Sequence, residues 1–113
     1  MSPDLVTMIG RVAGLREVSA SSTATEALVA QIEDRLTEGY AWALAGDAWS
    51  MRIEQRLRAP GSDTLVVVDD RDHRALAREH ACFCRDLVAL RRELAALRRE
   101  RDRLRGYRRA RSG

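Results

Sequence analysis

His80, Cys82 and Cys84 are the residues of this 113-residue chain whose types come closest to a metal site, because imidazole and thiolate are ligands that zinc prefers. On a helix His80 and Cys84 share a face while Cys82 points elsewhere, so the three cannot converge on one ion within a chain. His73 lies along the same ridge, and a dimer would bring two such sets together. The simpler interpretation is that these residues pack in a helix seam, so we expect no metal and no other cofactor.

The spacing of the other polar residues does not indicate catalysis. The chain contains no CxxC, no HExxH and no glycine-rich phosphate loop, and no residue has the surroundings of an activated nucleophile. We therefore predict a protein that is not an enzyme and has no catalytic residues.

The C-terminal part of the chain is rich in arginine. Residues 71–113 carry fourteen Arg and six acids, whereas residues 1–70 carry six Arg and eleven acids. Arginines bind phosphates through charge-assisted bonds, and a tyrosine ring can stack on a base. Nucleic-acid binding by this end is our alternative hypothesis, although no groove-entering element accompanies it. Its candidate contacts are Arg103, Arg105, Tyr107, Arg108, Arg109 and Arg111.

One long helix over residues 70–105 organises the rest of the chain. Its apolar residues recur with the a/d spacing of a coiled coil. They are Leu76, Phe83, Leu87, Leu90, Leu94, Leu97 and Leu104. A helix with such a seam requires a partner helix.

A second long helix is predicted over residues 23–58. The sequence Thr23-Ala24-Thr25-Glu26 forms a capping box at its start, and Ala59-Pro60-Gly61 stops it. The middle of its seam carries small residues, which allow a neighbouring helix to approach closely. They are Gly39, Ala43, Gly46 and Ser50.

Folding the third helix back on the second places each of these small residues opposite a large one. Gly39 meets Leu94, Ala43 meets Leu90, Gly46 meets Leu87 and Ser50 meets Phe83. In the same register Arg35 faces Glu100, Arg56 faces Glu79, and Glu33 lies near Arg98. We therefore predict a long antiparallel two-helix coiled-coil hairpin. The competing arrangement, a parallel self-dimer of the third helix alone, leaves the small residues unexplained.

A short amphipathic helix is predicted at the N-terminus, over residues 1–18. Ser2 is the expected N-cap, with Pro3 at the first helical position. Gly10 and Gly14 weaken this helix by roughly 1 kcal/mol each relative to Ala, so it depends on packing. The complete prediction is one all-α domain, residues 1–113, with a basic tail at 106–113. The segment Thr64–Val68 is either a short strand, an extended loop or an early turn of the third helix.

Two helices do not close a core, so apolar residues remain for other contacts. We expect the chain to dimerise with itself into a helical bundle and to bind a protein partner, as a small regulator or adaptor. The candidate partner or dimer interface comprises Leu5, Ile9, Val12, Leu28, Trp42 and Trp49. The weak first helix is the natural detachable element, covering an apolar face until a partner binds.

The cellular location is expected to be the cytoplasm. No signal peptide or membrane-spanning run of about 18 apolar residues occurs, so no membrane contact is expected. The two cysteines point to different faces of a helix, so no disulfide joins them.

Overall fold

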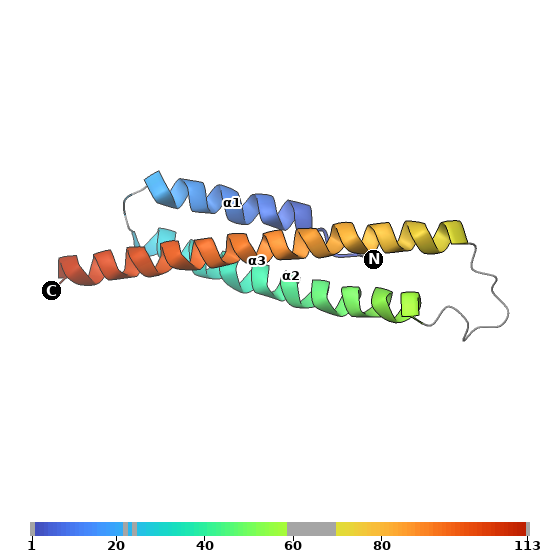
Figure 1. The fold of residues 1–113 in the computed structure, drawn as a ribbon. Helices are drawn as coiled ribbons and strands as arrows, with labels where there is room; N and C mark the ends of the chain where they lie inside the picture. The colour runs from blue at the N-terminus through green and yellow to red at the C-terminus, as the bar shows by residue number, and fades with distance from the viewer. Residues whose placement is uncertain (1, 22, 24, 59–69, 113) are drawn as a thin grey trace.

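The computed structural model describes residues 2–21, 23, 25–58 and 70–112, with side chains described for residues 71–106 of the last range. It contains three helices: α1 (Leu5–Ser21), α2 (Glu26–Arg58) and α3 (Asp70–Ser112), shown in Figure 1. No strand occurs in these ranges, which confirms the predicted all-α class. The segment Thr64–Val68 lies outside the described residues. Within the described ranges no helix has the length and apolar character needed to cross a membrane.

The three helices form a rod of 68 × 19 × 17 Å. α2 packs lengthwise on α3 with opposite chain direction, and α1 lies against both, alongside the C-terminal half of α3 (Figure 1). α1 runs in the same direction as α3, because Arg16 pairs with Glu93 while the later Ser19 carbonyl accepts a hydrogen bond from Arg103. The three-helix part therefore ends near the middle of the rod, and α2 and α3 continue from there as a pair.

The core is a line of side chains along the axis of the rod. Its most deeply buried members come from all three helices: Met8 and Val12 from α1, Ile32 from α2, and Leu90, Leu94 and Leu97 from α3. Each is at most 1% exposed. Core burial is the dominant stabilising term in a small domain, so α1 belongs to the folded unit.

The seam glycines of α2 lie directly against the leucines of α3. A Cβ at Gly39 would overlap Cδ2 of Leu94, and a Cβ at Gly46 would lie 3.0 Å from Cδ1 of Leu87. These two contacts are the ones that the sequence pattern predicts. Any side chain at position 39 would therefore force the Leu94 side chain to shift.

The helix starts differ from the predicted caps. The carboxylate of Asp4, and not Ser2, caps α1 by accepting bonds from the Thr7 amide (3.1 Å) and hydroxyl (2.6 Å). Thr25, and not Thr23, caps α2, because its Oγ1 accepts a bond from the Leu28 amide at 3.0 Å. Asp and Thr are both strong N-cap residues, so either choice satisfies the free amides of the first turn.

The flanking ion pairs also differ from the predicted ones. Arg35 pairs with Glu38 at 3.1 Å and Glu100 with Arg103 at 2.8 Å, each one turn away on the same helix. Such local partners need less side-chain ordering than partners on another helix. Between α2 and α3, Glu33 pairs with Arg105, and Asp47 pairs with Arg91. The Arg105 partner of Glu33 lies two turns beyond the predicted Arg98.

Candidate protein-interaction groove

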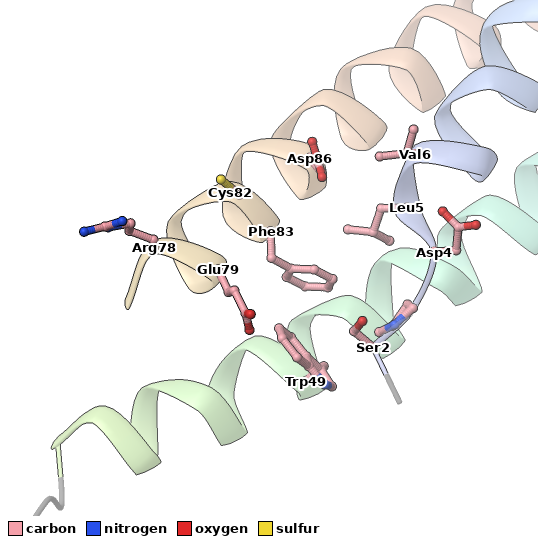
Figure 2. Close-up of a pocket in the computed structure, with 11 residues that line it drawn as sticks. Ser2, Asp4, Leu5, Val6, Trp49, Arg78, Glu79, Cys82, Phe83 and Asp86 are labelled. Atoms are coloured by element: carbon pink, nitrogen blue, oxygen red, sulfur yellow. The ribbon is translucent and has the colours of Figure 1, made fainter. Parts of the chain in front are cut away.

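An open groove of about 620 Å³ lies where α1 begins, between the first residues of α1 and the facing sides of α2 and α3 (Figure 2). Its floor is apolar and is formed by Leu5, Trp49 and Phe83. Its rim is charged and includes Arg78 and Glu79. An apolar floor with a charged rim is the arrangement found where one helix docks on another.

The aromatic pair in the floor gives the groove its shape. Trp49 and Phe83 come from facing helices, with ring centroids 4.6 Å apart and ring planes tilted by 50°. Phe83 is buried, whereas Trp49 is half-buried and keeps part of its surface open to the groove. A tryptophan held by a second ring presents a large apolar surface at little cost in conformational entropy.

The N-terminal cap of α1 lies beside the groove, since Asp4 is one of the lining residues. Asp4 accepts the hydrogen bonds from Thr7, and the side-chain bond from the Thr7 hydroxyl is the main reason why the pKa of Asp4 is lowered. The ionised carboxylate therefore stabilises the first turn of α1. Beyond this turn, the face of α2 and α3 that α1 covers continues without it toward residues 58 and 71 (Figure 1).

The structure places the residues of the predicted interface within and beside the core. Leu5, Val12 and Leu28 are at most 8% exposed and are buried against their own chain. Ile9 and Trp42 are half-buried and pack against the same core. In this conformation α1 fills part of the face predicted to bind a partner. Of the six, Leu5 and Trp49 line the groove, and Trp49 is the more exposed of the two.

Sequence reasoning missed an apolar surface on the outer side of α2. Leu44 is 70% exposed, Met51 59% and Tyr40 40%. All exposed residues from Tyr40 to Met51 are apolar; the other three are Ala41, Ala45 and Ala48. The available signal was that Asp47 is the one charged residue in that stretch.

His80 and Cys84 of α3 form a hydrogen-bonded cluster with Ser50 of α2. Nε2 of His80 lies 2.9 Å from Oγ of the buried Ser50 and 3.5 Å from Sγ of Cys84. Glu54 approaches the same nitrogen at 3.7 Å. Cys82 points away and is exposed. Among the described residues, no group of three or more His, Cys, Asp or Glu side chains is arranged to hold a metal ion.

The C-terminal arginines are partly neutralised by neighbouring acids. Arg103 pairs with Glu100, which raises the pKa of the arginine, and Arg105 pairs with Glu33. The segment predicted as a basic tail, 106–113, continues α3 as far as Ser112. The side chains of Tyr107, Arg108, Arg109 and Arg111 lie outside the described part of the structure.

Comparison of this chain with protein-family models, with curated proteins and with solved structures finds no match.

Proposed function

We propose that this chain is a non-enzymatic interaction module, a small cytoplasmic regulator or adaptor that binds a protein partner. The partner contributes an amphipathic helix, which lies in the groove at Trp49 and extends the line of α1 along α2 and α3. The observation that carries this proposal is the half-buried Trp49, which lies on Phe83 and is open to a groove with an apolar floor. Helix-in-groove recognition uses buried aromatic anchors of this kind.

The proposal includes a coiled-coil hairpin of α2 and α3 and a homodimer of the whole chain. The contacts of Gly39 with Leu94 and of Gly46 with Leu87 support the hairpin, because small residues facing large ones recur along the seam. Apolar surface left exposed on α2 supports association with another chain.

A pull-down from native cell extract tests the groove. The tagged chain is expected to retain a protein that Trp49→Ala retains at least about tenfold less well, as for an interface anchor. Met51→Ala is the matched control, since Met51 is exposed on α2 but lies outside the groove. Equal recovery by the Trp49→Ala and wild-type chains would remove the groove from the proposal.

Detachment of α1 belongs to the same proposal. α1 and the proposed partner helix lie on the same face of α2 and α3, and α1 covers part of that face. Deleting residues 1–18 uncovers this part and is therefore expected to strengthen partner binding. The measurement is the affinity of the captured partner for the truncated and complete chains. Unchanged or weaker binding would contradict a masking role for α1.

The second candidate function is nucleic-acid binding by the C-terminal end of α3. It is favoured by the helix continuing through the arginines as far as Ser112, at the end of the rod that carries the C-terminus (Figure 1). Binding through phosphates loses affinity steeply with salt and is abolished by removing residues 103–113. A salt titration with duplex DNA and with single-stranded RNA separates this function from protein binding.

A further inference from the structure

We infer that the homodimer forms through the outer face of α2, with the α2 helices of two copies packed antiparallel around Ala41, Leu44 and Ala45. This inference deepens the homodimer part of the proposed function and is independent of the groove at Trp49. It rests on three properties of one face of α2. The face is apolar and exposed, it points away from α1 and α3, and it has acidic residues at one end and arginines at the other.

The outer face of α2 is apolar over three turns. Leu44 and Met51 are the most exposed large apolar side chains of this helix, at 70% and 59%, and Tyr40 borders them. The exposed alanines between them leave room for a second helix backbone to approach closely. In a chain with 33% charged residues, a stretch of this length whose single charge, Asp47, pairs with Arg91 of α3 is a departure from ordinary helix surfaces.

This face has no cover within the described chain. The buried side of α2 carries Gly39, Ala43 and Gly46, which face α3, and Trp42 and Trp49 occupy the flank toward α1. With 3.6 residues per turn, Ala41, Leu44 and Ala48 point away from both neighbours. The outer face is therefore available to another molecule while α1, α2 and α3 stay packed.

Charges on either side of the apolar stretch identify a second copy as the occupant. Before it, α2 carries Glu33, Asp34 and Glu38, together with Arg35, which pairs with Glu38. After it come Arg52, Arg56 and Arg58, together with Glu54, which approaches His80 of α3. Asp34, Arg52 and Arg56 are exposed, and none of the three forms an ion pair within the described chain. Asp34 and Arg52 lie too far from the helix ends to be explained by the helix dipole, which acts within the first and last turns.

An antiparallel arrangement is the one that satisfies these charges. With a two-fold axis beside Ala41 and Ala45, Asp34 of each copy comes opposite Arg52 of the other, and the apolar side chains meet in the centre. A two-fold contact uses the same surface twice, so a surface with an acidic and a basic end complements itself. A parallel arrangement would place acids opposite acids and arginines opposite arginines.

Sedimentation equilibrium of the complete chain tests the inference. The wild-type chain is expected to be a dimer at micromolar concentration, and Leu44→Glu to weaken the dimer by about 30-fold or more, as for a central interface residue. Val6→Glu is the matched control, because Val6 is 65% exposed on α1 and lies at the groove. A monomeric wild-type chain, or a dimer that Val6→Glu disrupts and Leu44→Glu does not, would overturn the inference.

A charge exchange tests the antiparallel register. Asp34→Arg and Arg52→Asp are each expected to weaken the dimer, and the chain carrying both is expected to recover it, because the two reversed charges again face each other. Single variants that dimerise like wild type, or a double variant weaker than either single one, would exclude this register. Circular dichroism of each variant confirms that the helices are intact.

Loss of the dimer with retained partner capture by Leu44→Glu would show that the groove and the α2 face act separately.

Discussion

At the scale of single residues, Gly39 is the described glycine around which the packing leaves least room for a side chain. A Cβ there overlaps a terminal methyl group of Leu94, which is fully buried. Replacing Gly39 with Ala gains about 1 kcal/mol in helix propensity, but overpacking of the core costs about 1–3 kcal/mol. The cost of overpacking is expected to be the larger of the two. Gly39→Ala is expected to lower the free energy of unfolding by about 1 kcal/mol, measured by urea denaturation.

Gly14 supplies the control, because nothing lies within 4 Å of a Cβ built there. Gly14→Ala is expected to raise the free energy of unfolding by up to about 1 kcal/mol, through helix propensity alone. If Gly39→Ala and Gly14→Ala changed the free energy of unfolding in the same direction and by the same amount, the close packing at position 39 would be contradicted.

Asp4 gives the structure a pH-dependent helix start. Its pKa is lowered chiefly by the hydrogen bond from the Thr7 side chain, so the carboxylate is favoured in the folded chain. The cap therefore stabilises α1 above the ordinary pKa of Asp4 and is lost as pH falls through the lowered value. Measured against the intrinsic exchange rate at each pH, the protection of the Thr7 amide is expected to decrease below about pH 4. In Asp4→Ala the same amide exchanges fast already at neutral pH, and a protected amide in that variant would argue against the cap.

Residue contacts were predictable where a repeating pattern fixed them. The seven-residue spacing predicted that Gly39 and Gly46 face Leu94 and Leu87, and both contacts occur. The ion pair of Arg35 was predicted wrongly, because Glu38 lies one turn away on the same helix. A flexible charged side chain on the surface can pair with several partners at similar energy. The repeat that determines the apolar contacts therefore does not determine the surface ion pairs.

At the scale of elements, α1 is an integral helix of the bundle despite its two glycines. Met8 is 1% exposed and contacts the common core, whereas Val6 on the same helix is 65% exposed. Met8→Ala is expected to lower the free energy of unfolding by about 2–4 kcal/mol, because it leaves a cavity. Val6→Ala is expected to change it by less than about 0.5 kcal/mol. A thermal melt of both variants checks this, and a mild effect of Met8→Ala would mean that α1 is already detached in solution.

The helices were predictable as elements, but their ends were less so. Turn signals near Pro60 and apolar periodicity located all three helices. The caps moved by two residues, because Asp4 and Thr25 compete with Ser2 and Thr23 for the same role. The groove was not predictable, since it depends on where α1 begins relative to Trp49 and Phe83 on two other helices.

At the scale of the whole molecule, burial is concentrated in the three-helix part of the rod. The side chains with no exposure, such as Ile32, Leu90 and Leu97, lie where α1, α2 and α3 overlap. Toward residues 53–58 and 71–80, α2 and α3 extend beyond the first residue of α1 (Figure 1). Amide hydrogen exchange is expected to be slowest in the overlap and to quicken toward the two-helix end, since local opening follows the number of buried contacts. Uniform protection along α2 and α3 would contradict this gradient.

The pairing of Gly39 with Leu94 has a consequence for how such a sequence can change over time. Because the two positions share one fixed volume, a bulkier residue at 39 is tolerated only alongside a slimmer one at 94, and the same holds for 46 and 87. Homologues that keep this architecture should therefore show compensating substitutions at these two pairs, a signature that can be read from an alignment without any coordinates.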